Sequence, residues 1–68
     1  MSGRKLEEAR HKAGLSRAEV ARRTGWTDKT IYRLEKGESP ARAYHLLVLS
    51  ALYGVSARDL ENDDGEAA

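Results

Sequence analysis

The chain has 68 residues, no cysteine, and 12 lysine and arginine residues against 11 aspartate and glutamate residues, for a formal net charge of +1. A chain this short makes one domain, and without cysteine it forms neither a disulfide framework nor a thiolate metal site. No apolar run approaches the roughly 20 residues of a membrane-spanning helix, and the polar N-terminal residues do not resemble a secretory signal. These features predict a small cytoplasmic domain.

The small net charge hides an uneven distribution along the sequence. Residues 1–58 contain all 12 basic residues and six acidic ones, whereas residues 59–68 contain five acidic residues and no basic one. We therefore expect a basic domain over residues 1–60, which attracts nucleic acid, and an acidic, disordered tail over residues 61–68. The tail either keeps the protein soluble or competes with DNA phosphates for the basic face.

The hydrophobic pattern and the capping residues predict five helices in chain order. Ser16 and Glu19 have the spacing of a capping box at the start of the second helix, and Thr27 can cap the third. Gly25 lies where the chain must leave the second helix, and a positive φ is expected there. The expected helices cover residues 4–13, 17–24, 28–36 and 42–53, and the fifth begins at Ser56. The predicted fold is therefore a compact, all-α, five-helix domain.

Residues 15–37 read as two short helices joined by a tight turn, and the second of these helices is unusually polar. Its only strongly apolar residues at helical spacing are Ile31 and Leu34. Lys29 and Arg33 lie four residues apart, and their like charges repel each other unless a polyanion lies against them. We expect this helix to enter the major groove of DNA, where arginine and lysine donate hydrogen bonds to guanine. The alternative is a solvated surface helix.

Two apolar features leave alternatives open. Trp26 in the turn is expected to plug the core between the third and fifth helices, the other interpretation being a wedge that inserts into DNA. Residues 46–53 are apolar around more of their helix than one core-facing stripe requires. Either this helix is the central core helix and is covered all round, or Val48, Leu52 and Val55 form a dimer surface.

A set of residues spread from position 6 to position 60 fits one known family. The set comprises Arg10, Gly14-Leu15-Ser16, Ala18-Glu19, Ala21, Gly25, Thr27, Ile31, Leu34-Glu35, Gly37, Pro40, Gly54-Val55-Ser56 and Leu60. With these residues the chain resembles the lambda-repressor-like, or Cro/repressor (XRE-type), helix-turn-helix proteins. The resemblance implies a phage or bacterial repressor that binds a pseudo-palindromic operator in double-stranded DNA, as a homodimer formed in solution or only on DNA. The alternative is an antitoxin or accessory protein-interaction module with the same fold.

The resemblance also implies roles for residues by position. The residues that would read base edges are Asp28, Lys29, Tyr32 and Arg33, and those that would contact phosphate are Ser16, Arg17, Thr27, Thr30, Lys36 and Arg42. Arg10 and Glu35 match an ion pair that ties the first helix to the end of the third. Arg17 stands where glutamine is usual, which favours phosphate contact over bracing of the recognition helix. Asp28 either reads a base or only stabilises the start of its helix.

Catalysis and metal binding are not expected. His11 and His45 lie far apart in the sequence, no acidic cluster has metal-ligand spacing, and no glycine-rich phosphate loop is present. The sequence therefore predicts a protein that is not an enzyme and that takes no metal, cofactor or small-molecule ligand.

Overall fold

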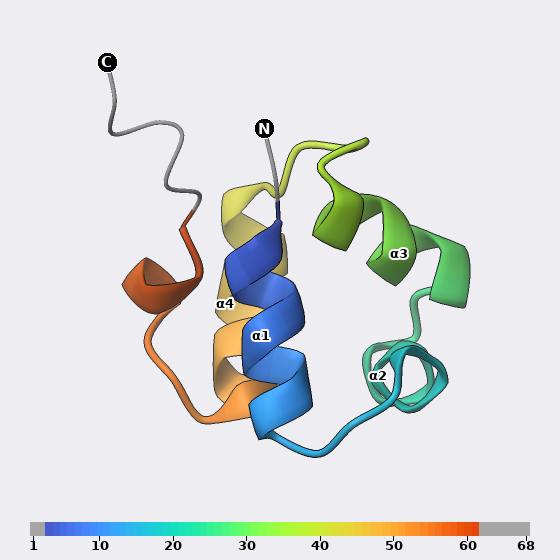
Figure 1. Ribbon diagram of the computed structural model, residues 1–68, viewed down its shortest axis with the longest axis horizontal. Coiled ribbons are helices and arrows are strands. Elements are labelled where there is room, and N and C mark those ends of the chain that lie inside the picture. The colour runs from blue at the N-terminus through green and yellow to red at the C-terminus, as the bar shows by residue number, and fades with distance from the viewer. Residues whose placement is uncertain (1–2, 62–68) are drawn as a thin grey trace.

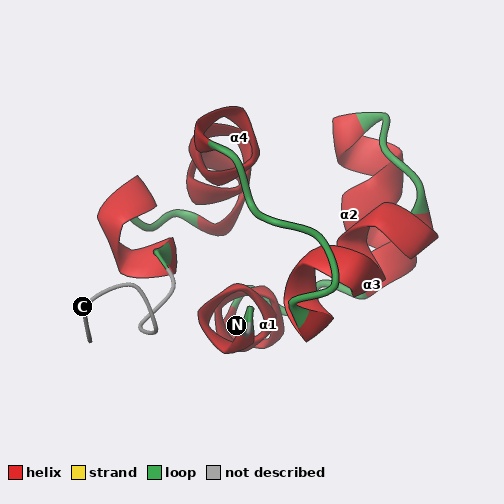
Figure 2. Ribbon diagram, turned by 90° about the horizontal axis from the view of Figure 1, so that it is seen from above, coloured by secondary structure: helices red, strands yellow, loops and turns green. Residues whose placement is uncertain are grey.

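The chain folds into four α-helices and one short 3-10 helix, which are α1 (Arg4–Lys12), α2 (Arg17–Thr24), α3 (Asp28–Lys36), α4 (Ala43–Tyr53) and η1 (Ala57–Leu60). The computed structural model describes residues 3–61, so the expected tail, apart from Glu61, lies outside the described residues. α1 packs against α3, α4 and η1, while α2 packs against α3 (Figure 1). Seen from above, α2 and α3 lie on one side of α1 and α4, and η1 lies on the other (Figure 2).

The prediction of a fifth α-helix is wrong, because the chain after Ser56 makes only the 3-10 turn Ala57–Leu60. The capping box expected there is present: Ser56 Oγ accepts a hydrogen bond from the Asp59 N–H at 3.2 Å, and the Asp59 carboxylate accepts one from the Ser56 N–H at 3.3 Å. A longer helix would place Glu61 at its negative C-terminal end, which the helix dipole disfavours. The other predicted boundaries hold to within one residue, with α1 ending at Lys12 and α4 beginning at Ala43.

Local signals set the ends of α2. Ser16 Oγ accepts a hydrogen bond from the Glu19 N–H at 3.1 Å, but the Glu19 carboxylate pairs with Arg22 and Arg23 and does not complete the expected capping box. The hydrogen bonds from these two arginines lower the pKa of Glu19. Gly25 ends the helix with a φ of +82°, a left-handed conformation that costs glycine little.

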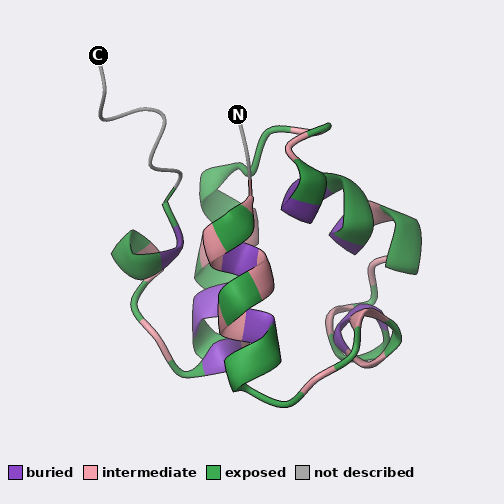
Figure 3. Ribbon diagram, in the orientation of Figure 1, coloured by how far each residue is buried: buried purple, intermediate pink, exposed green. Residues whose placement is uncertain are grey.

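The core takes apolar side chains from every helix. The buried apolar residues are Leu6, Val20, Ala21, Ile31, Leu34, Leu49, Tyr53 and Leu60. Figure 3 shows them on the sides of the helices that face one another. Trp26 is half-buried against this cluster, but its ring meets His45 of α4, with ring centroids 5.1 Å apart, rather than plugging a gap beside a fifth helix.

The start of α1 lies directly against the end of α3. The Gly3 N–H donates a hydrogen bond to the carbonyl oxygen of Glu35 at 3.1 Å. A Cβ atom at Gly3 would lie 2.1 Å from the carbonyl oxygen of Leu34, so no other residue fits without a backbone shift. This close approach fixes the position of α1 relative to α3.

His45 holds the first turn of α4. Its Nδ1 accepts a hydrogen bond from the backbone N–H of Arg42 at 3.0 Å. Burial, and then the positive charge of Arg42, lowers the pKa of His45 below its ordinary value. Because a protonated imidazole has no acceptor nitrogen, acid removes this cap.

The free energy of unfolding should therefore fall as the pH drops below about 6.5, the ordinary pKa of histidine. Unfolded chains bind a proton at His45 near that pH, whereas folded ones do so only at lower pH, so the unfolded state binds more protons. This contribution is complete above about pH 6.5 and is lost as the pH falls through the lower pKa of the folded state. Urea denaturation at several pH values measures the loss, with fluorescence of Trp26, the only tryptophan, as the signal.

The control for this prediction is His45→Gln, which keeps an acceptor for the Arg42 N–H but does not titrate. This variant should lose less stability than the wild type between neutral and mildly acidic pH. Equal losses in the two proteins would assign the pH dependence to other groups.

Candidate nucleic-acid interface

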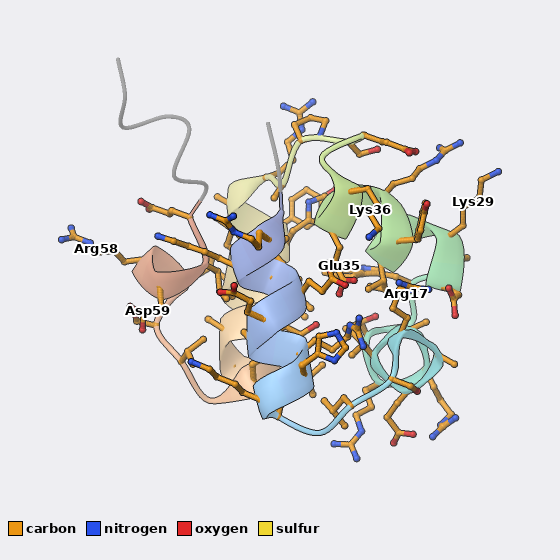
Figure 4. All side chains as sticks on the ribbon, in the orientation of Figure 1. Arg17, Lys29, Glu35, Lys36, Arg58 and Asp59 are labelled. Carbon is orange, nitrogen blue, oxygen red and sulfur yellow. The ribbon has the colours of Figure 1, made fainter. Side chains whose placement is uncertain are left out.

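α3 has one apolar side and one cationic side. Ile31 and Leu34 are buried, whereas Lys29 and Arg33 are exposed. Figure 4 shows Lys29 pointing away from the rest of the domain. Neither cation has an ion-pair partner among residues 3–61. The exposed side of α3 thus offers two uncommitted cations four residues apart.

The N-terminal ends of α2 and α3 carry the three hydroxyl groups that were expected to contact phosphate, those of Ser16, Thr27 and Thr30. Ser16 Oγ and Thr27 Oγ1 each accept a backbone N–H at 3.1 Å as helix caps. A capping hydroxyl that accepts from the backbone still has a hydrogen to donate. Thr27 and Thr30 share a further hydrogen bond of 2.9 Å between their hydroxyls, so only one of these two hydrogens stays available. Arg42, which precedes α4, is exposed.

Arg17, the first residue of α2, lies among three groups of α3. Its Nε is 3.7 Å from Asp28 Oδ1, and its Nη1 is 3.8 Å from Glu35 Oε1. Its Cζ lies 5.1 Å from the centroid of the Tyr32 ring. The two ion-pair distances exceed hydrogen-bond range, and Nε is buried without a hydrogen-bond partner in the described part of the chain.

Lys36 approaches the same aromatic ring from the next turn of α3. Its Nζ lies 5.7 Å from the Tyr32 centroid and 3.9 Å from Glu7 Oε1. The sequence interval of four residues between Tyr32 and Lys36 signals their contact. The approach of Arg17 from α2 had no such signal.

A buried ion pair supports this surface from behind. Arg10 donates hydrogen bonds to Glu35 from Nε at 2.6 Å and from Nη2 at 3.2 Å, and a third from Nη1 to the carbonyl oxygen of Leu15 at 2.9 Å. The Glu35 carboxylate raises the pKa of Arg10. The resemblance implied this contact between α1 and the end of α3, and the bond to Leu15 adds the loop that leads to α2.

Tyr53 of α4 lies near this pair. Its hydroxyl is buried and has no hydrogen-bond partner within residues 3–61. Burial, and then the negative charge of Glu35, raises the pKa of Tyr53 to about 12, so the phenol stays neutral. The polar centre of the domain therefore holds one ion pair and one neutral hydroxyl.

α4 exposes apolar side chains that the domain itself does not cover. Tyr44, Leu47 and Val48 are 59%, 63% and 41% exposed, and their spacing places them on one side of the helix. The interpretation that α4 is covered all round is therefore wrong. Of the expected dimer surface, Val48 belongs to this exposed side, whereas Leu52 and Val55 are half-buried and pack against the core.

Within the described residues, no three histidine, aspartate or glutamate side chains gather as a metal site would require. The longest helix there, α4, has 11 residues, and none is long and apolar enough to cross a membrane.

Comparison with known proteins gives one match. The family described as "Helix-turn-helix domain" matches residues 3–62, which include all the described helices. No curated protein and no solved structure matches the chain significantly. Because the family match covers most of the 68 residues, and α2, Gly25 and α3 form the motif itself, the chain belongs to the Cro/C1-type (XRE-like) helix-turn-helix family of DNA-binding domains.

Proposed function

We propose that this protein regulates transcription by binding a specific sequence in double-stranded DNA with α3 in the major groove. The observation that carries the proposal is the exposure of Lys29 and Arg33 on α3, without anionic partners in the described chain. Two like charges four residues apart on one helix repel each other in the free protein, and DNA phosphates and base edges remove this penalty. The family gives DNA as the partner and transcriptional regulation as the usual role.

Within this proposal the residues of the site divide into two groups, one that reads bases and one that contacts phosphate. Lys29 and Arg33 read base edges, because arginine and lysine side chains fit the O6 and N7 acceptors of guanine. The residues assigned to phosphate are Ser16, Arg17, Thr27, Thr30, Lys36 and Arg42, which lie at the ends of α2 and α3 or just before α4. Phosphate contacts of this kind set the register on DNA without reading its sequence. The carboxylate Oδ1 of Asp28 lies 3.7 Å from Arg17 Nε. This proximity supports a role in neutralising the arginine rather than in reading a base.

We further propose a Cro-type repressor that binds an inverted repeat as a homodimer. The exposed apolar residues Tyr44, Leu47 and Val48 support a protein-protein interface on α4, in addition to the DNA-binding side of α3. The same three residues favour the second candidate, an antitoxin or accessory module that uses this fold mainly to bind another protein. The two candidates differ in whether sequence-specific DNA binding is the main activity.

Selection of bound duplexes from a random library separates these candidates. At about 0.15 M salt, where non-specific attraction is screened, we expect an enriched inverted repeat with half-sites about one helical turn apart. The matched control is the double variant Lys29→Gln and Arg33→Gln, which should enrich no motif. If the folded wild-type protein also enriches none, the protein-interaction module becomes the better function.

A further inference from the structure

Tyr32 is flanked by two cations that come from different helices. Arg17 begins α2, Lys36 ends α3, and both lie within 6 Å of the Tyr32 centroid, at 5.1 and 5.7 Å. Such distances are typical of cation–π contacts, in which the negative face of the ring attracts the cation. Figure 4 shows Arg17 between α2 and α3 and Lys36 on the part of α3 nearer α1, whereas Lys29 points away from the domain.

Arg17 and Lys36 each lie near carboxylates but donate no hydrogen bond to them. Arg17 lies 3.7 and 3.8 Å from its two carboxylate neighbours, and Lys36 lies 3.9 Å from its own. These separations give Coulomb attraction without a direct hydrogen bond. Arg17 Nε is buried, but the Arg17 side chain is partly exposed and donates no hydrogen bond to these carboxylates, so its Nη groups and the Lys36 ammonium are left for an acceptor from outside the domain.

We propose that Tyr32 is a positioning residue that holds Arg17 and Lys36 together as a clamp for the phosphates of one DNA strand. The proposal rests on the DNA-binding function proposed above and assigns Tyr32 away from base reading. A phosphodiester is the chemistry that fits, because it offers several acceptor oxygens and one negative charge to a pair of cations. The ring prearranges side chains that would otherwise lose rotamer freedom on binding.

The carboxylates around the clamp favour this ligand over a base edge. Glu35 is committed to Arg10, and Asp28 and Glu7 each lie near one clamp cation, so the cations are partly neutralised in the free protein. A DNA phosphate competes with these weak pairs and gains hydrogen bonds that they lack. The aromatic face meanwhile remains with the two cations.

The test compares Tyr32→Leu, which removes the ring, with Tyr32→Phe, which keeps it. Fluorescence titration with a random-sequence duplex and with the selected duplex gives the affinities at several salt concentrations. We expect Tyr32→Leu to weaken binding to both duplexes by the same factor, about two- to fivefold, because Arg17 and Lys36 both lose the ring that prearranges them for phosphate. Tyr32→Phe should restore wild-type affinity, which a base-reading or hydrogen-bonding role of the hydroxyl would not allow.

A double-mutant cycle with Lys36→Gln then tests the link between ring and cation. In the otherwise wild-type protein, Lys36→Gln should lower the slope of log affinity against log salt concentration by about one. The effect of Lys36→Gln should be smaller in the Tyr32→Leu background. The proposal is overturned if Tyr32→Leu changes the preferred sequence, if Tyr32→Phe is as weak as Tyr32→Leu, or if neither variant alters binding. Absence of any duplex binding by wild-type protein overturns the proposed function itself, which is a different result from loss of the Tyr32 effect.

Discussion

Replacing Glu35 with alanine should lower the free energy of unfolding by about 3–5 kcal/mol, because the Arg10 guanidinium would stay charged and buried without its partner. The side chains of Arg10 and Glu35 are only 6% and 1% exposed, so the guanidinium would lose its partner without gaining the hydration of an exposed group. A domain of this length has a total stability of only about 3–10 kcal/mol. We therefore expect a largely unfolded variant, as measured by circular dichroism during urea or thermal denaturation.

Two controls separate the ion pair from a general effect of charge. Glu38→Ala removes an exposed carboxylate just after α3 and should change the stability by less than about 0.5 kcal/mol. Replacing Arg10 with methionine and Glu35 with leucine together removes both buried charges and should recover part of the loss. A Glu35→Ala protein that folds with nearly wild-type stability would show that the pair is not needed.

The ion pair also limits what DNA-binding data can show. The Glu35 carboxylate accepts hydrogen bonds from Arg10, and its Oε1 lies 3.8 Å from Arg17 Nη1, so Glu35 links the buried ion pair to the proposed clamp. A Glu35 variant without DNA binding is explained by loss of the fold and gives no evidence of a DNA contact. Variants at exposed positions are the ones that report on the interface.

The helix-turn-helix could be predicted from the sequence because its boundaries depend on local chemistry. Ser16 and Thr27 cap the two helices through their own side chains, and Gly25 takes up the left-handed turn. These interactions span no more than four residues, so a single sequence displays them. The boundaries of α2 and α3 accordingly agree with the prediction at both ends.

The rest of the fold depends on interactions that the sequence does not display. α4 has apolar residues on all sides, so its sequence could not reveal that Leu49 would face the core while Leu47 would face solvent. The capping box at Ser56 predicted a helix start but not a helix length, and only a 3-10 turn formed. The side of α4 that faces the core is set by its packing against α1 and η1, which a local pattern does not encode.

The candidate site shows the same division. Lys29 and Arg33 could be named from their spacing on one helix, since helical periodicity places them side by side. The approach of Arg17 to Tyr32 joins residues of two helices and required the angle between α2 and α3. Sequence reasoning thus named the charged residues of the candidate interface but not the contact between Arg17 and Tyr32.

Replacing Arg33 with alanine should weaken binding to the selected duplex by about 1–3 kcal/mol and relax the preference at one base pair, because a base-reading hydrogen-bond donor is lost. Lys36→Ala should instead weaken all sequences evenly and reduce the salt dependence by about one ion. Affinity measurements on the selected duplex, its single-base variants and a random duplex distinguish the two effects.

The control for Arg33→Ala is Arg58→Ala, which removes the same charge from η1 on the side of the domain away from α3 (Figure 4). At about 0.15 M salt the Debye length is only about 8 Å, so the charge of Arg58 is screened from DNA bound at α3 and its loss should have little effect. If Arg33→Ala and Arg58→Ala weaken binding equally, net charge and not a groove contact holds the DNA. If Arg33→Ala and Lys36→Ala lose affinity equally on specific and random duplexes, the division between base-reading and phosphate-binding residues is wrong.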